Sequence, residues 1–151
     1  MRILVLHGPN LNQLGRREPT IYGTLTLQEI NRRIEEKAAS LGVAAQCLQF
    51  SHEGDLVDAI HQAQETADYI IINAAAYTHY SIALRDALAS VSVPAIEVHL
   101  SNIFARTDEP LRQKSMIGKN CIGCIAGFGL TGYVLAILAL WRHITDHPNF
   151  M

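Results

Sequence analysis

Glu97 and His99 are the residues whose types and spacing most directly suggest chemistry. They stand two apart in the short apolar run AIEVHL at 95–100. Residues two apart in a strand point to one face, and a central parallel strand is normally apolar on both faces, so burying this pair needs a reason. A carboxylate beside an imidazole sets its tautomer and favours the imidazolium, which suits acid or base catalysis near neutral pH. The alternative is a histidine that only caps the edge of a sheet.

A second candidate is the charged loop GRREPTIYG at 15–23, which contains Arg17 and Tyr22. Tyrosine is a base at neutral pH only where its phenolate is stabilised, and a guanidinium within hydrogen-bonding range lowers a tyrosine pKa by roughly one to three units. Because Gly15 and Gly23 bound the loop, it could close over a site as a lid and expel water. The plain alternative is a solvated surface turn.

The apolar pattern of the chain predicts the scaffold that would position these residues. Short apolar runs bounded by turn or polar residues are strand candidates at 3–6, 44–50, 69–74, 95–100 and 121–127. Helical spacing lies between and after them, at about 27–41, 54–66, 79–91 and 133–145. Thr26 and Glu29 form a capping box before the first helix, and Gly42 ends it. Alternating strands and helices predict an α/β fold, with a parallel sheet covered by helices on both faces.

Polar side chains follow the predicted strands where such a sheet binds ligands, at the carboxyl ends of the strands. They are Asn10 after the first strand, Asn73 and His79 after the third, and Glu97, His99 and Ser101 at the fourth. The helix predicted to begin near His79 has free N–H groups that attract anions. His79 itself either donates to a polar ligand or lies on the helix surface.

Composition sets the class of protein. With 151 residues, 49% of them hydrophobic, the chain is expected to form a single catalytic domain over 1–151. A formal net charge of −2 does not indicate a broad basic surface of the kind that binds nucleic acid or anionic lipid. The start MRILVLHG enters a strand without a leader pattern, so the cytoplasm is expected. The uncharged stretch 121–141 contains four glycines, which favour a buried strand, a turn and a helix over a membrane span.

Two spacings are typical of metal or redox sites but lack the remaining ligands. Cys121 and Cys124 form C-x-x-C without a second pair, and in a strand their odd separation would point them to opposite faces. His143 and His147 stand four apart, without the glutamate of an H-E-x-x-H motif. The lysines lie in charged or polar segments, so none is expected to be a neutral nucleophile that forms an imine. We therefore expect a reaction without a metal, an imine or a bound cofactor.

Several motifs together resemble the type II 3-dehydroquinases. They are HGPNLN at 7–12, LGRREPTIYG at 14–23, NAAAYTHYS at 73–81, EVHLSN at 97–102 and GFGLTGY at 127–133. The resemblance implies a flavodoxin-like, doubly wound sheet of five parallel strands in order 2-1-3-4-5, and assembly as a dodecamer of trimers. It also implies a shikimate-pathway dehydratase that converts 3-dehydroquinate to 3-dehydroshikimate by anti elimination through an enolate or enol.

The resemblance assigns catalytic roles to five residues. Tyr22 would remove the proton alpha to the ketone, with its pKa lowered by Arg17. Asn10 would help to stabilise the enolate through a water molecule. His99, oriented by Glu97, would protonate the departing hydroxyl group.

The resemblance also assigns binding roles. Asn73, His79 and Arg112 would hold the ring hydroxyl groups of the substrate. Leu100 and Ser101 would offer hydrogen-bond donors to its carboxylate. Asp86, in the helix after the third strand, would reach the site of a neighbouring subunit.

Two other functions remain alternatives. The pattern G-x-G-x-x-G at 127–132 is typical of a dinucleotide-binding oxidoreductase, but the acidic ribose partner, expected about twenty residues further on, would fall past the end of the chain. A flavin- or nucleotide-binding flavodoxin-like module without catalysis is the other alternative, and an absorption spectrum of the purified protein distinguishes it.

Overall fold

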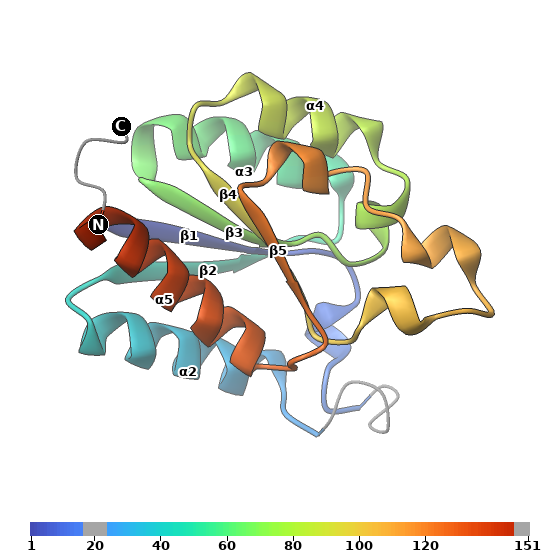
Figure 1. Cartoon of the computed structure of the whole chain (residues 1–151), viewed down its shortest axis with the longest axis horizontal. Coiled ribbons are helices and arrows are strands. Elements are labelled where there is room, and N and C mark those ends of the chain that lie inside the picture. The colour runs from blue at the N-terminus through green and yellow to red at the C-terminus, as the bar shows by residue number, and fades with distance from the viewer. Residues whose placement is uncertain (17–23, 147–151) are drawn as a thin grey trace.

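A computed structural model of the chain describes residues 1–16 and 24–146, without the side chains of 144–146. Within these residues, five strands form one parallel sheet in the order β2-β1-β3-β4-β5 (Figure 1). The strands are β1 Arg2–His7, β2 Ala44–Gln49, β3 Tyr69–Asn73, β4 Ala95–His99 and β5 Gly123–Ala126. The predicted α/β class and the strand order 2-1-3-4-5 are therefore confirmed.

Helices cover both faces of this sheet. In the described part of the chain the α-helices are α2 Leu27–Ser40, α3 Glu53–Thr66, α4 Ile82–Ser90 and α5 Thr131–Asp146. Helices α2 and α5 pack on one face, and α3 and α4 pack on the other (Figure 1). Short 3-10 turns are η1 Leu11–Gln13, η2 Ala75–His79, η3 Ile103–Ala105, η4 Pro110–Gln113 and η5 Gly118–Asn120.

The side chains of β1 point alternately to the two faces of the sheet, which explains why the strands are continuous apolar runs in the sequence. Ile3 and Val5 join the core under α2 and α5, whereas Leu4 and Leu6 join the core under α3 and α4. Successive side chains of a strand point to opposite faces, so a strand covered on both faces needs apolar residues at every position. A polar residue inside such a strand must therefore find a polar partner.

Local signals place the helix ends. The capping box is present, since the Glu29 N–H donates to the Thr26 hydroxyl and the Thr26 N–H donates to the Glu29 carboxylate. The helix predicted over 79–91 begins later than expected, at Ile82. The reason is that the Ser81 hydroxyl caps it by accepting from the Leu84 N–H at 2.9 Å, while η2 takes up the residues before it.

The uncharged stretch near the carboxyl terminus divides as expected into β5 and α5. The strand covers only Gly123–Ala126, so Cys121 precedes it and the predicted strand over 121–127 is too long. Among the described residues, no helix has the length and hydropathy that a transmembrane span requires.

Gly8 permits a close approach where the strand order reverses between β1 and β3. Its N–H donates to the Asn73 carbonyl oxygen at 2.8 Å, directly after β1 ends. A Cβ atom at Gly8 would lie 2.5 Å from the Ala74 carbonyl oxygen. Only glycine allows the two chain segments to leave the sheet so close together.

Replacing Gly8 should therefore destabilise the fold. Gly8→Ala should lower the free energy of unfolding by about 1–3 kcal/mol, because the new methyl group must displace backbone atoms. Gly54→Ala is the matched control, since Gly54 lies in α3 with nothing within 4 Å of its would-be Cβ. The free energy of unfolding of that variant should rise by up to about 1 kcal/mol, because alanine has a higher helix propensity than glycine. Urea titrations that give both variants the same stability would contradict this role for Gly8.

Candidate active site

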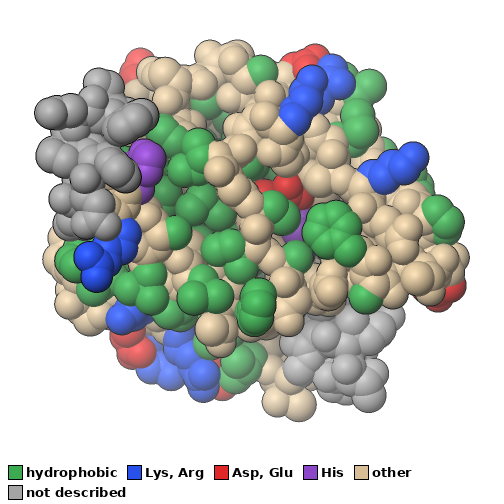
Figure 2. Space-filling view, viewed as in Figure 1, with side chains coloured by type: hydrophobic (Ala, Val, Ile, Leu, Met, Phe, Trp, Pro, Cys, Tyr) green, Lys and Arg blue, Asp and Glu red, His purple; other side chains and the backbone are tan. Residues whose placement is uncertain are grey.

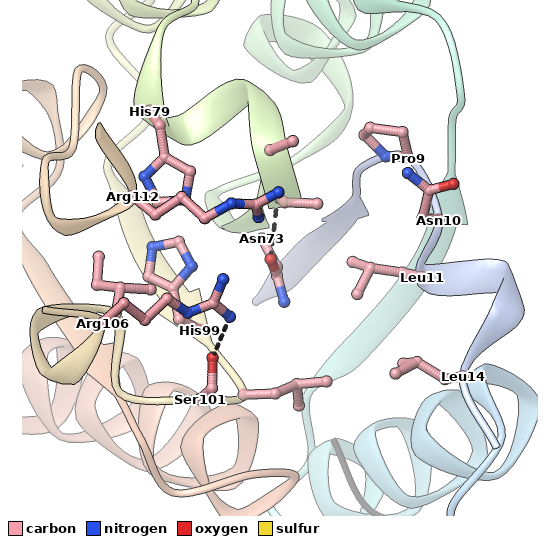
Figure 3. A pocket seen from close by; sticks show the side chains of 14 residues that line it. Pro9, Asn10, Leu11, Leu14, Asn73, His79, His99, Ser101, Arg106 and Arg112 are labelled. Carbon is pink, nitrogen blue, oxygen red and sulfur yellow. Dashed lines mark hydrogen bonds between the residues drawn. The ribbon is translucent and has the colours of Figure 1, made fainter. Parts of the chain in front are cut away.

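A pocket lies at the carboxyl edge of the sheet, where β1, β3 and β4 end (Figure 3). This is the place at which parallel sheets of this type bind ligands. Its walls are Pro9, Asn10, Leu11, Leu14, Asn73, Ala75, Ala76, His79, His99, Leu100, Ser101, Ile103, Arg106 and Arg112. The pocket thus brings together seven of the residues predicted from the sequence, namely Asn10, Asn73, His79, His99, Leu100, Ser101 and Arg112.

Glu97 and His99 form the buried pair that their spacing predicted. Glu97 is 0% exposed and His99 is 4% exposed. The Glu97 Oε1 atom lies 2.6 Å from His99 Nε2. Because an ionised carboxylate only accepts hydrogen bonds, this contact makes Nε2 the protonated nitrogen. Nδ1 is then the nitrogen of His99 that can exchange a proton with a ligand in the pocket.

Ser115 completes the surroundings of the Glu97 carboxylate. Its Oγ lies 2.9 Å from both carboxylate oxygens and accepts from the Gly118 N–H at 2.9 Å. A Cβ atom at Gly118 would lie 2.8 Å from Glu97 Oε2, so a larger residue would press on the carboxylate. Sequence reasoning missed Ser115 and Gly118, since both lie in a connector without a periodic pattern.

His79 lies in the pocket wall within η2, not on the surface of a helix. Its Nδ1 lies 2.8 Å from the Lys114 carbonyl oxygen, which can only accept, so Nδ1 carries the proton. Burial lowers the pKa of His79, and His99, Arg112 and Arg106 act in the same direction, although the Lys114 carbonyl raises it. The neutral ring therefore offers the Nε2 lone pair. Of the two alternatives left open by the sequence, the structure places His79 in the pocket wall, and its role toward a ligand stays a prediction.

Arg106 and Arg112 make the pocket cationic. Arg106 donates from Nη2 to the Ser101 hydroxyl oxygen at 2.8 Å, which leaves the Ser101 proton available to a ligand. Arg112 forms an ion pair with Glu109 and also lines the pocket. Guanidinium groups recognise carboxylates well because their donors are planar and forked. Arg106 was missed by sequence reasoning, since it lies in a segment without a periodic pattern.

Two residues beside the pocket have a left-handed backbone. Asn10 has φ of 66° and Ala75 has φ of 51°. Asparagine tolerates this conformation, whereas alanine pays roughly 1–2 kcal/mol for it. The Ala75 N–H donates to Asn73 Oδ1 at 3.2 Å, which offsets part of that cost. Strained backbone of this kind concentrates at functional sites.

Four predicted residues are not placed in the lining of this pocket, and one of them, Glu97, lies behind it as the partner of His99. Arg17 and Tyr22 lie outside the described residues. Asp86 is exposed on α4, forms an ion pair with Arg85 and does not line the pocket of its own chain.

One group of three potential metal ligands occurs in the part of the chain that the structure describes. It consists of Glu97, His99 and Cys124, whose ligand atoms lie within 4.8 Å of one another. Glu97 and His99 are already hydrogen-bonded to each other, and the Ser115 hydroxyl donates a hydrogen bond to the Glu97 carboxylate. Burial and the nearby Glu97 carboxylate raise the pKa of Cys124 to about 11. A metal ion would have to displace these bonds and ionise the thiol, so the residues do not form a prepared metal site.

Comparisons with known proteins agree with this geometry. A sequence model described as dehydroquinase class II matches residues 1–141. The 3-dehydroquinate dehydratase of Pelotomaculum thermopropionicum is 53% identical over 139 residues, which cover 92% of this chain and 95% of that protein. The enzyme with the same name from Gloeothece citriformis is 54% identical over 147 residues, covering 97% of this chain and 95% of the relative.

Solved structures show the same similarity in three dimensions. The type II dehydroquinase of Propionibacterium acnes superposes with a TM-score of 0.89 and 45% identity, covering 93% of this chain and 96% of that one. The type II dehydroquinase of Butyrivibrio crossotus gives a TM-score of 0.89 and 46% identity, with coverage of 93% and 97%. Together with the match along residues 1–141, these similarities show that the chain belongs to the class II dehydroquinase family.

Proposed function

We propose that the chain carries out its family's reaction, conversion of 3-dehydroquinate to 3-dehydroshikimate in the shikimate pathway, with the residues of this pocket. The observation that carries the proposal is the buried hydrogen bond between Glu97 and His99, beside a pocket lined by Arg106 and Arg112. Loss of water from a hydroxy ketone needs a base for the proton alpha to the carbonyl and an acid for the departing hydroxyl. The carboxylic acid of the substrate needs cationic or N–H partners.

His99 is proposed as the acid. With Nε2 held by Glu97, a proton on Nδ1 gives an imidazolium whose charge the carboxylate balances. As the carbon–oxygen bond breaks, Nδ1 transfers this proton to the leaving oxygen and water forms. The histidine ends neutral, with Nε2 still bonded to Glu97, so the pair changes charge without changing its hydrogen bond.

The remaining residues of the pocket are proposed to bind and orient the ring. The Ser101 hydroxyl, the Leu100 backbone and Arg106 would hold the carboxylate, since Arg106 already bonds to Ser101. His79 would accept a hydrogen bond from a ring hydroxyl at Nε2. Asn73 and Arg112 would complete the binding of the ring hydroxyl groups, and Asn10 would hold a water molecule at the enolate oxygen.

Tyr22 is proposed as the base, with Arg17 stabilising its phenolate, as the family resemblance implies. Tyr22→Phe removes only the phenolic oxygen, so kcat should fall by about 10²- to 10⁴-fold, the usual loss for a general base. KM should change less, because the ring and carboxylate contacts lie elsewhere. The rise in ultraviolet absorbance of the conjugated enone measures the rate directly.

Tyr69→Phe is the matched control for this experiment, since Tyr69 begins β3 at the edge of the sheet opposite the pocket. It loses the same hydroxyl group and should keep near-normal kcat. If an assembled Tyr22→Phe variant has a kcat close to that of the control, the catalytic role of the loop at 15–23 is wrong and the alternative of a solvated surface turn holds.

The chain is further proposed to act as a dodecamer of trimers. Figure 2 shows hydrophobic side chains gathered on the face that carries β5 and α5. Ile122 and Phe128, which flank the edge strand β5, are 56% and 61% exposed. Exposed apolar groups beside an open sheet edge favour contact with another chain. Asp86, which does not line its own pocket, would reach the pocket of a neighbour.

Asp86→Ala tests the shared site. Activity or assembly should fall in this variant, whereas the chain should remain folded because an exposed pair such as Arg85–Asp86 contributes less than about 1 kcal/mol. Asp58→Ala, on the exposed face of α3, is the control and should behave as the unmodified protein. Sedimentation and specific activity should be measured over the same dilution series. Full specific activity in a monomeric sample would rule out a requirement for assembly.

A cytoplasmic location and a single catalytic domain over 1–151 are also proposed. Cys47, Cys121 and Cys124, all among the described residues, are free thiols, as is usual in reducing compartments. Both apolar cores lie on one shared sheet, which favours folding as a unit. Detection of the protein outside the cytoplasmic fraction of cells would contradict the location.

A further inference from the structure

The side chain of Asn73 is held at both ends of its carboxamide. Asn73 ends β3 in the pocket wall and is 3% exposed (Figure 3). Its Oδ1 accepts from the Ala75 N–H at 3.2 Å, on the side of η2. Its Nδ2 donates to the Tyr133 hydroxyl at 3.1 Å, on the side of α5. One N–H and one oxygen lone pair remain for a ligand.

Tyr133 joins this amide to a second buried polar side chain. It lies in the first turn of α5 and is 1% exposed. Its hydroxyl oxygen lies 3.0 Å from Nδ1 of His7, the last residue of β1. The ring centroids of His7 and Tyr133 lie 5.3 Å apart with an interplanar angle of 58°. A single hydroxyl group therefore bridges β1, β3 and α5 beneath the pocket.

The directions of these hydrogen bonds follow from the chemistry of each group. An amide nitrogen only donates, so the Tyr133 oxygen accepts from Asn73, and its own proton goes to His7 where Nδ1 of that ring is unprotonated. That requires an unprotonated Nδ1 in a neutral ring. Burial lowers the pKa of His7 from 6.5 to about 4, although the Asn31 side chain acts in the opposite direction. Near pH 7 the ring is neutral, and in the tautomer that carries its proton on Nε2 the order is Asn73 to Tyr133 to His7.

We propose that Tyr133, with its hydroxyl proton directed by His7, is a positioning residue that acts together with the Ala75 N–H to fix which way the Asn73 carboxamide faces. The proposal rests on the proposed role of Asn73 in binding a ring hydroxyl group. If the Tyr133 oxygen is absent, only the 3.2 Å bond from the Ala75 N–H opposes rotation of the amide by half a turn, which would exchange donor for acceptor. The alternative is that Tyr133 serves only to pack α5 against the sheet.

A double-mutant cycle distinguishes these two roles. Tyr133→Phe keeps the ring and removes the hydroxyl, and kcat/KM should fall by about five- to tenfold, mainly through KM. In an Asn73→Ala background, the same substitution should change kcat/KM by less than about twofold, because the amide that it positions is gone. A purely structural Tyr133 would produce equal losses in both backgrounds, and that result would overturn the proposal. Tyr69→Phe, which removes the hydroxyl of a buried tyrosine that does not line the pocket, should have no effect in either background.

His7→Phe keeps the proposal testable if Tyr133→Phe does not assemble. It removes the acceptor for the tyrosine proton. The hydroxyl can then donate to Asn73 Oδ1 instead, which favours the opposite orientation of the amide. Its effect on kcat/KM should likewise disappear in the Asn73→Ala background. Persistence of the full effect there would overturn the proposal.

The cycle also separates this proposal from the proposed function. Asn73→Ala with unchanged kcat/KM would remove the substrate role of Asn73 and this proposal with it. An impaired Asn73→Ala beside an unimpaired, assembled Tyr133→Phe would overturn only the positioning role.

Discussion

The hydrogen bond between Glu97 and His99 is the interaction on which the rest of the site depends. A carboxylate removed from water is costly unless its oxygens are paired and hydrogen-bonded. Glu97 is fully buried, and the structure supplies His99 and the Ser115 hydroxyl as its partners. Because Glu97 occupies Nε2 of His99, the same bond that makes burial of the carboxylate tolerable also selects Nδ1 as the nitrogen for proton transfer.

The parallel sheet explains why this pair meets the other polar groups. His99 ends β4 and Asn73 ends β3, its neighbour in the sheet, while His7 ends β1 on the far side of β3. Parallel strands bring their carboxyl ends to one edge, where the chain leaves the sheet as loops and short turns. The apolar alternation that builds both cores stops at this edge, and polar side chains replace it. Asn73, His79 and His99 each have a hydrogen-bond partner that restricts the direction of the side chain.

Sequence reasoning reached those parts of the site that local patterns determine. The spacing of Glu97 and His99 shows that they share a strand face, and the apolar runs place Asn73 at the edge of the sheet. Ser115 and Arg106 could not be found in this way, because their partners are separated from them by connectors without periodicity. The role of His79 depends on a carbonyl at Lys114, which no pattern of side chains encodes. Tyr133 reads as part of an apolar helix, so its buried hydroxyl became significant only when its two partners were located.

The most direct test of the account is the kcat of Glu97→Gln at saturating 3-dehydroquinate. Glutamine has nearly the same shape, but it cannot balance an imidazolium or enforce a proton on Nε2 of His99. Glu36→Gln is the matched control, since Glu36 is an exposed partner of Arg32 on α2. The account predicts that kcat falls by about 10²- to 10⁴-fold in Glu97→Gln and stays normal in the control, with both proteins folded and assembled. A folded, assembled Glu97→Gln with near-normal kcat would contradict it.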